Sequence, residues 1–140
     1  LERIKLLVDS GTEEGAKCWQ SGQKLPRKGF WFKPTIFTEC AQSHQIVQKE
    51  IFGPVLAIQT FRTPEEAVEK ANNTPYGLSG GVWTDKGSKV FKITNQIRAG
   101  VLWANTFNKF DPASPFGGYK ESGLGREGGL QGLAPYLDLH

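Results

Sequence analysis

Hydrophobic residues recur at helical spacing in three stretches of the chain. The apolar positions within residues 1–8 lie on one face of a helix, which we expect to end at Gly11. Residues 63–66 supply an N-cap threonine, a proline in the first turn and a capping-box glutamate, and they predict a helix whose inward face holds Ala67, Val68 and Ala71. A third helix is predicted to run up to Gly100, with an apolar face formed by Val90, Ile93 and Ile97.

Short runs of apolar, aromatic and β-branched residues predict strands between these helices. The runs are 16–21, 30–37, 55–61, 80–84 and 101–105. Pro34 limits the pairing of the second run, because proline has no main-chain donor. From residue 55 to 105 strands and helices alternate, and the strands are apolar on both faces, which is typical of parallel strands covered by helices. We therefore predict an α/β fold with three layers, α/β/α, around a mostly parallel open sheet.

Residues 106–129 show almost no periodicity, and they predict a long loop, which inside a compact domain is usually functional or disordered. The loop contains G-L-G-R-E-G from Gly123 to Gly128, a literal match to the dinucleotide-binding pattern G-x-G-x-x-G. That pattern needs a strand before it and an acidic residue about 20 positions later. No strand pattern precedes it here, and only 12 residues follow Gly128. We therefore interpret these glycines as positions of tight turns and close packing.

Composition limits the class of protein. A length of 140 residues fits about one domain, and a net charge of +3 with both signs interspersed excludes the clustered basic face that nucleic-acid binding needs. No apolar run approaches the ~18 residues of a membrane span. Because the chain contains no methionine and begins inside an apolar pattern, we expect a fragment of a longer protein. The two cysteines favour a reducing, intracellular environment.

Neither cysteine is predicted to be a nucleophile. Cys18 lies beside Trp19 in a predicted strand, and we expect it to be a small buried hydrophobic residue. Cys40 and His44 would face each other on a helix, as a dyad or as half of a metal site. No third ligand is nearby, because His140 is terminal and isolated, so we predict no metal site.

Three segments together resemble one known family. They are "KEIFGPV" (49–55), "ANNTPYGLSGGVWT" (71–84) and "AGVLWANTFNKFDPASPFGGYKESGLGREGG" (99–129). They are similar to the C-terminal half of the catalytic domain of the NAD(P)-dependent aldehyde dehydrogenase superfamily, and the similarity runs through essentially the whole chain. The resemblance implies that residues 1–140 are the C-terminal part of that domain, without the Rossmann domain and without the segment that carries the catalytic cysteine.

The resemblance implies a cofactor contact at Glu50 and Phe52. In this family the glutamate of E-I-F-G-P-V hydrogen-bonds the nicotinamide ribose hydroxyls, and the phenylalanine packs beside the nicotinamide ring. A carboxylate suits the first role because it can accept two hydroxyl donors at once. The cofactor, NAD or NADP, would be held mainly by the absent Rossmann domain. The alternative interpretation is that Glu50 caps a turn before the strand and that Phe52 belongs to the core.

The resemblance also implies that the segment after Asn105 lines the tunnel for an uncharged aldehyde substrate, through Asn108, Phe110 and Phe116. The alternative is ordinary packing beneath a long loop. The loop would be fixed by Lys120, Ser122 and Arg126. Glu127 would be the partner of a neighbouring cation. For these four residues the alternative is a solvated surface.

The family oxidises an aldehyde to a carboxylic acid through a cysteine thiohemiacetal, hydride transfer to NAD(P)+ and hydrolysis of a thioester by glutamate-activated water. Neither the G-Q-x-C nor the E-L-G-G motif that carries this chemistry occurs here, so we expect no catalytic residue in the chain and no activity of the chain alone. We expect a parent that is a homodimer or homotetramer, without nucleic-acid or membrane partners. We expect it in the cytoplasm, with a mitochondrial location as the alternative. The alternative from another class is a non-catalytic scaffold or interaction module of the same family.

Overall fold

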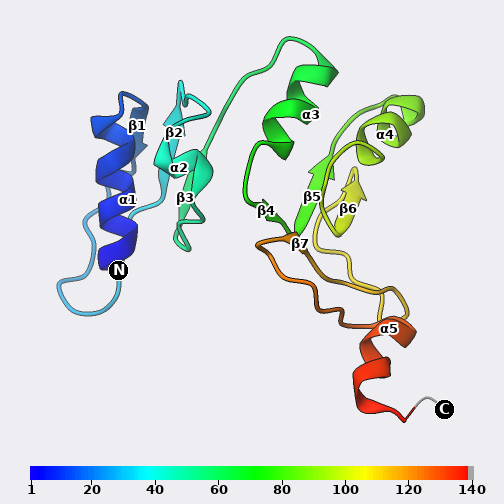
Figure 1. The fold of residues 1–140 in the computed structure, drawn as a ribbon. Coiled ribbons are helices and arrows are strands. Elements are labelled where there is room, and N and C mark those ends of the chain that lie inside the picture. The colour runs from blue at the N-terminus through cyan, green and yellow to red at the C-terminus, as the bar shows by residue number, and fades with distance from the viewer. Residues whose placement is uncertain (139–140) are drawn as a thin grey trace. The chain divides into compact units, whose positions relative to one another are not determined.

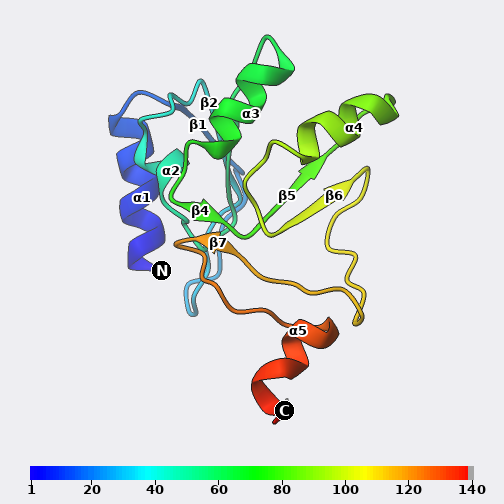
Figure 2. The same ribbon diagram turned by 45° about the vertical axis from the view of Figure 1, so that its right-hand side comes forward.

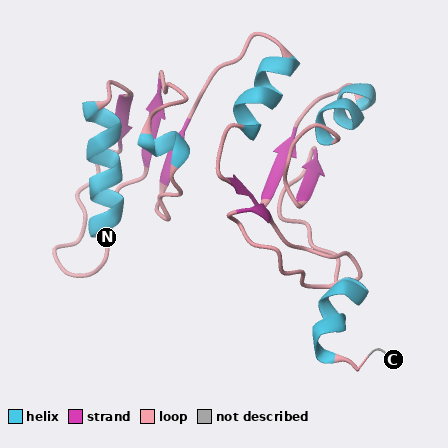
Figure 3. Cartoon of the chain, viewed as in Figure 1, coloured by secondary structure: helices cyan, strands magenta, loops and turns pink. Residues whose placement is uncertain are grey.

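The computed structural model describes residues 1–138, and the chain divides into two compact units at the Arg62–Thr63 bond. Figures 1 and 3 show the helices and strands of each unit. The first unit contains α1 (Glu2–Glu13), β1 (Lys17–Gln20), β2 (Thr35–Thr38), α2 (Gln45–Gln48) and β3 (Val55–Ala57). The second contains α3 (Pro64–Asn72), β4 (Tyr76–Gly77), β5 (Ser79–Val82), α4 (Gly87–Thr94), β6 (Val101–Ala104), β7 (Tyr119–Lys120), α5 (Gly129–Leu133) and the 3-10 helix η1 (Ala134–Tyr136).

The first unit is built on a three-stranded sheet with β2 in the middle. β2 runs antiparallel to β1, with Phe37 opposite Cys18, and parallel to β3, with Ile36 opposite Leu56. The Phe37 side chain is fully buried. The rest of the core cluster comes from α1, α2 and the connecting segments and consists of Leu7, Val8, Ala16, Ile46 and Ile51. Removal of these apolar side chains from water is the main force that holds this unit together.

The first helix ends later than the sequence predicts. α1 continues to Glu13, and it ends in a Schellman motif rather than at Gly11. In this motif the N–H of Ala16 donates to the carbonyl of Gly11 at 3.0 Å, and the N–H of Gly15 donates to that of Thr12 at 3.1 Å. Gly15 has a φ of +94°, the left-handed conformation that the motif requires and that glycine adopts without strain. Gly11 itself lies inside the helix and is buried.

The second unit contains a β-α-β arrangement that the sequence predicts. β5 and β6 pair in parallel, with Ser79 opposite Val101, and α4 connects them (Figure 2). β4 and β7 form a separate antiparallel pair. The side chain of Thr63 accepts a hydrogen bond from the N–H of Glu66 at 3.2 Å, so the predicted N-cap of α3 is confirmed. The α/β class is confirmed, and the described strands form three short sheets, of which β1–β2–β3 belongs to the first unit.

α4 ends at Thr94 rather than at Gly100, and the reason lies in α3. The side-chain amide of Asn72 donates to the carbonyl of Gln96 at 2.8 Å and accepts from the N–H of Arg98 at 2.7 Å. These main-chain groups are thereby bound by a side chain instead of continuing the helical ladder. The end of this helix is therefore set by a residue more than twenty positions earlier in the chain.

Several other boundaries differ from the prediction. The run 30–37 becomes a strand only from Thr35, after Pro34. Before the proline, Phe30 and Trp31 are exposed, and Phe32 is half-buried against the core of the first unit. The run 55–61 is a strand only over Val55–Ala57. Ala71, predicted to face inward, is exposed. The predicted loop 106–129 is irregular apart from β7 and one bridge between Phe116 and Glu127.

The burial of Gly11 predicts a packing defect on substitution. A Cβ at Gly11 would lie 2.9 Å from two side-chain carbons of Ile46 and 3.1 Å from the ring of Phe37. Overpacking of this kind costs about 1–3 kcal/mol, and alanine gains ~1 kcal/mol over glycine in a helix, which leaves a net cost of about 0–2 kcal/mol. We expect Gly11→Ala to lower the free energy of unfolding by about 1 kcal/mol, the middle of this range. Chemical denaturation of the whole protein measures this, and Gly22→Ala, where a Cβ meets nothing within 4 Å, is the control. Equal stability of the two variants would contradict the packing role.

Candidate cofactor and substrate sites

The first candidate site is the Glu50 turn, residues 50–53, which connects α2 to β3. Ile51 is 8% exposed and belongs to the core of the first unit, whereas Phe52 is 74% exposed. Glu50 is exposed as well. The buried isoleucine therefore leaves its two neighbours on the surface of the unit, and Phe52 is not part of the core that the alternative interpretation proposed.

Phe52 has a left-handed main chain, with a φ of +54°. This conformation costs a non-glycine residue roughly 1–2 kcal/mol, because its Cβ approaches a carbonyl oxygen. Such strain persists where the surroundings fix the chain, and it is concentrated at functional sites. Here the neighbours on both sides are fixed. Ile51 is buried, and a Cβ at Gly53 would lie 2.7 Å from Ile4 of α1.

The carboxylate of Glu50 has no partner within residues 1–138: it forms neither a hydrogen bond nor a salt bridge there. Its main chain is held instead, since the guanidinium of Arg3 donates to the Glu50 carbonyl at 2.7 Å. The interpretation of Glu50 as a turn cap has no support in these contacts. Both carboxylate oxygens remain able to accept hydrogen bonds from a bound molecule.

An apolar groove of about 330 Å³ lies beside Phe52 in the first unit. Its wall is formed by α1, by the segment before β2 and by the Glu50 turn, through Leu1, Ile4, Phe30, Trp31, Phe32, Gly53 and Pro54. Three of these side chains are aromatic. The surface next to the Phe52 ring is therefore suited to contact with a flat, weakly polar group.

The second candidate site, in the second unit, is an aromatic cluster around Trp103 of β6. The ring of Trp103 makes edge contacts with Phe107 and Phe110, with centroids 4.9 and 5.6 Å apart, and Phe110 makes the same kind of contact with Phe116 at 5.0 Å. Trp103 is 7% exposed, and its indole N–H donates to the carbonyl of Lys109 at 2.9 Å. Two of the predicted tunnel residues, Phe110 and Phe116, are therefore brought together. Trp103 and Phe107 are not among the residues that the sequence predicts for the site, although the apolar run "VLWAN" carries the first of them.

Asn108, the third predicted tunnel residue, is exposed and has a φ of +54°. It lies between Phe107 and Phe110 in the turn that Trp103 closes. The start of this turn is fixed by Asn105, whose side-chain amide accepts from the N–H of Thr84 at 2.9 Å and donates to its carbonyl at 3.0 Å. The amide thus extends the pairing of β5 and β6 by one position before the chain leaves the sheet.

The three residues predicted to fix the loop do so. The ammonium of Lys120 donates to the carbonyls of Asn72 and Thr74 at 2.9 and 3.0 Å, and the hydroxyl of Ser122 accepts from the N–H of Gly77 at 3.0 Å. The guanidinium of Arg126 donates to the carbonyls of Gly118 and Gly125, each at 2.8 Å, and lies over the ring of Tyr119. Glu127 pairs with Phe116 through its main chain, and its side chain forms no salt bridge with the described part of the chain.

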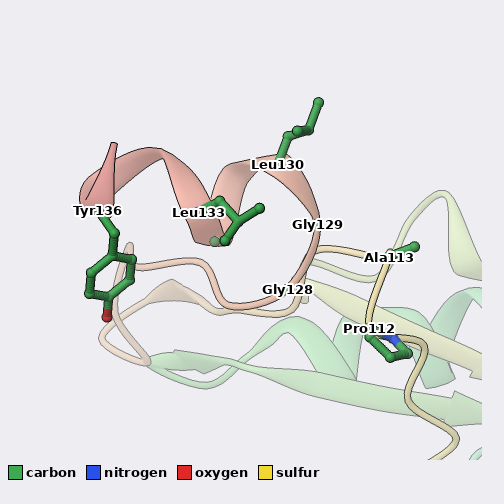
Figure 4. A pocket seen from close by; sticks show the side chains of 8 residues that line it. Pro112, Ala113, Gly128, Gly129, Leu130, Leu133 and Tyr136 are labelled. Atoms are coloured by element: carbon green, nitrogen blue, oxygen red, sulfur yellow. The ribbon is translucent and has the colours of Figure 1, made fainter. Parts of the chain in front are cut away.

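Two pockets border the same loop. One, of about 410 Å³, is lined by the predicted tunnel residues Phe110 and Phe116 together with Asp111, Pro112, Ser114, Glu127 and Gly128. The other, of about 520 Å³, lies beside α5 and is lined mainly by Leu130, Leu133, Tyr136 and the segment 112–113 (Figure 4). Both contain Pro112 and Gly128, so they adjoin at this segment.

The glycines of this region serve close packing and turns, as the sequence analysis expects. A Cβ at Gly100 would overlap the carbonyl oxygen of Gly117, so two main-chain segments meet there. Gly123 and Gly128 have φ values of +98° and +71°. The strand before the G-x-G-x-x-G match is the two-residue β7, which pairs antiparallel with β4, and the helix after it, α5, has five residues. This is not the β-α-β context of a dinucleotide loop.

The prediction that Cys18 is buried is wrong. Cys18 is exposed in the described structure and not buried: it lies on β1, at the edge of the sheet, and all four residues of this strand are exposed. Cys40 is half-buried, and burial raises the pKa of its thiol. Cys40 precedes α2 and is not in a helix, so it does not face His44 across a helical turn; the Nδ1 of His44 accepts from the N–H of Ala41 at 3.2 Å. His140 lies outside the described residues.

No group of three or more His, Cys, Asp or Glu residues placed to hold a metal ion occurs within residues 1–138. Of the helices in the same range, none combines the length and the apolar character needed to cross a bilayer.

The whole chain, residues 1–140, matches the model of the Aldehyde dehydrogenase family. An aldehyde dehydrogenase of Enchytraeus buchholzi is 43% identical over 139 residues, which are 99% of this chain and 28% of that protein. A betaine aldehyde dehydrogenase of Bacillus subtilis is 42% identical, with 98% of this chain and 29% of that protein covered. The chain thus spans less than a third of the length of these relatives.

Solved structures give the same result. An NAD-dependent aldehyde dehydrogenase from Sinorhizobium meliloti superposes with a TM-score of 0.91 at 39% identity, over 96% of this chain and 27% of that one. An aldehyde dehydrogenase from Bacillus cereus, solved as its NAD+ complex, superposes with a TM-score of 0.91 at 42% identity, over 96% and 28% of the two chains. From the motifs, the fold and these matches over its full length, the chain belongs to the aldehyde dehydrogenase family.

Proposed function

We propose that the protein to which this chain belongs oxidises aldehydes to carboxylic acids with NAD+ or NADP+. The family membership supports this, as do relatives whose names state activity on betaine aldehyde and retinal. The observation within the chain that carries the proposal is the Glu50 turn. It presents a carboxylate that has no partner among residues 1–138, next to a phenylalanine that is exposed and has a left-handed main chain.

In this proposal, the first contribution of the chain to the reaction is to orient the cofactor. Glu50 accepts hydrogen bonds from the two hydroxyls of the nicotinamide ribose, and its free carboxylate fits that donor pair. Phe52 packs beside the nicotinamide ring and restricts where a flat ring can lie. The bound nicotinamide supplies the acceptor for hydride. Because the rest of the cofactor is held by a domain that these 140 residues do not include, the chain by itself is expected to be inactive.

The second contribution of the chain is to form one wall of the aldehyde tunnel. Phe110 and Phe116 offer aromatic edges to an uncharged substrate, and Asn108 offers an amide at the same loop. Trp103 of β6 contacts the Phe110 ring, and Phe110 in turn contacts Phe116, so the strand positions rings that lie in the loop. The nucleophilic cysteine is expected outside this sequence, since neither the exposed Cys18 nor the half-buried Cys40 lies in the segments that carry the site. For the parent we propose a homodimer or homotetramer in the cytoplasm.

The ribose contact predicts a specific kinetic defect. In the whole protein, Glu50→Gln is expected to slow hydride transfer about tenfold or more, because hydrogen bonds to a charged acceptor are worth about 1.5–3 kcal/mol and the amide replaces one acceptor by a donor. The measurement is the rate of NAD(P)H formation together with the isotope effect of an aldehyde deuterated at the carbonyl carbon, which should rise as hydride transfer becomes limiting. Glu2→Gln, at an exposed carboxylate on α1, is the control. Unchanged kinetics of Glu50→Gln would remove this residue from the cofactor site.

The aromatic wall predicts a defect in substrate use. Phe110→Leu keeps an apolar side chain but loses the ring, and kcat/KM for an aromatic aldehyde is expected to fall about tenfold, equivalent to about 1.4 kcal/mol. The KM for NAD(P)+ should not change. The matched control is Phe91→Leu, at a ring that is 73% exposed on α4. If both variants lose the same small fraction of kcat/KM, Phe110 does not line the tunnel.

A further inference from the structure

The segment that would contact the ribose is held at both ends by consecutive residues of α1. The guanidinium of Arg3 donates to the carbonyl of Glu50 at 2.7 Å, a bond that joins residues 47 positions apart. The next residue, Ile4, fills the space that a Cβ at Gly53 would need, with its Cδ1 2.7 Å from that position. One turn of α1 therefore contacts the Glu50 turn at both its first and its last residue.

Arg3 binds the main-chain carbonyl of Glu50 and not its carboxylate, which leaves the carboxylate for a ligand. A guanidinium near a glutamate usually forms a bidentate pair with its carboxylate. Here it donates to the main-chain oxygen, and within residues 1–138 no salt bridge involves Glu50. The main chain of Glu50 is therefore fixed while both carboxylate oxygens stay available. A pair between the two side chains would have used the acceptors that ribose hydroxyls need.

The position of this contact also bears on Phe52. Its left-handed φ of +54° is strained, and strain of this kind relaxes unless the flanking residues are fixed. Burial of Ile51 fixes the centre of the turn, and the Arg3 bond fixes the residue before it. Loss of the bond would free the main chain of Glu50 to rotate, and the carboxylate would lose its fixed direction.

We propose that Arg3 is a positioning residue for cofactor binding, acting through the main chain of Glu50. This inference rests on the proposed ribose contact of Glu50. Arg3 does not touch the cofactor in this proposal. It reduces the freedom that Glu50 would otherwise lose when the ribose hydroxyls bind, which is the general effect of preorganisation.

The test is a double-mutant cycle in the whole protein between Arg3→Met and Glu50→Gln. Methionine keeps much of the length and the apolar stem of arginine but cannot donate. We expect Arg3→Met to slow hydride transfer and to raise the KM for NAD(P)+ about fivefold in the native background, and to change both less than twofold in the Glu50→Gln background. A merely structural role would lower the rate by the same factor in both backgrounds, and that result would overturn the proposal.

Two further variants keep the test decisive. Arg3→Lys retains a cationic donor and should restore most of the rate. If Arg3→Met does not fold, Arg3→Leu, whose side chain cannot donate either, takes its place in the cycle. Lys5→Met removes an exposed cation from the same helix, whose side chain forms no hydrogen bond with the described residues, and it should leave the rate unchanged. If Glu50→Gln alone has no effect, the proposed function of Glu50 fails, and the role of Arg3 fails with it. If Glu50→Gln slows hydride transfer and Arg3→Met does not, only the role of Arg3 is wrong.

Discussion

The burial of Ile51 is the interaction on which the first candidate site depends. Enclosing an isoleucine side chain in a core contributes about 1.5–3 kcal/mol, and the left-handed conformation of the next residue costs roughly 1–2 kcal/mol. The gain is at least comparable to the cost, so the core of the first unit can hold Phe52 in a strained conformation. With the isoleucine turned inward, its two neighbours are on the surface: Glu50, whose carboxylate has no partner among the described residues, and the exposed ring of Phe52. The exposure of Glu50 and Phe52 is thus a consequence of the burial of Ile51, which lies between them.

In both units a glycine lets another segment come closer than a side chain would allow. Gly53 leaves room for Ile4, and Gly100 leaves room for the carbonyl of Gly117. The second contact brings the segment before β6 against Gly117, which follows Phe116 in the loop 106–129. A pattern that looks like a phosphate-binding loop is in this chain a set of close contacts and turns, and what distinguishes the two is the structure on either side.

Features that depend on neighbouring residues could be predicted from the sequence, whereas features that depend on distant ones could not. The N-cap of α3 was predicted because Thr63, Pro64 and Glu66 carry the whole signal within four positions. The sequence predicts helix ends at both Gly11 and Gly100, because a glycine that stops a helix and one that permits a close contact are identical in the sequence. The true end of α4 is set by Asn72, and no local pattern contains that information.

The same distinction applies to the candidate sites. The motifs identified Glu50, Phe52, Asn108, Phe110 and Phe116, and their roles remain predictions. What the motifs did not contain is the support: Arg3 beneath the Glu50 turn, and Trp103 at the centre of the aromatic cluster. Cys18 was expected to be buried because its neighbours are apolar, but an edge strand buries only what another element covers.

The loop of the second unit has a defined conformation although most of it lacks regular secondary structure. Main-chain groups that would pair in a strand need other partners, because an unpaired group away from water is costly. Side chains supply several of them: the indole of Trp103 binds the carbonyl of Lys109, the amide of Asn105 binds both main-chain groups of Thr84, and Arg126 binds two carbonyls. Each of these bonds involves a planar side-chain group: the indole and the guanidinium donate, and the amide of Asn105 both donates and accepts. A loop held in this way can direct aromatic rings at angles that a strand does not offer, because successive side chains of a strand point to opposite faces of the sheet.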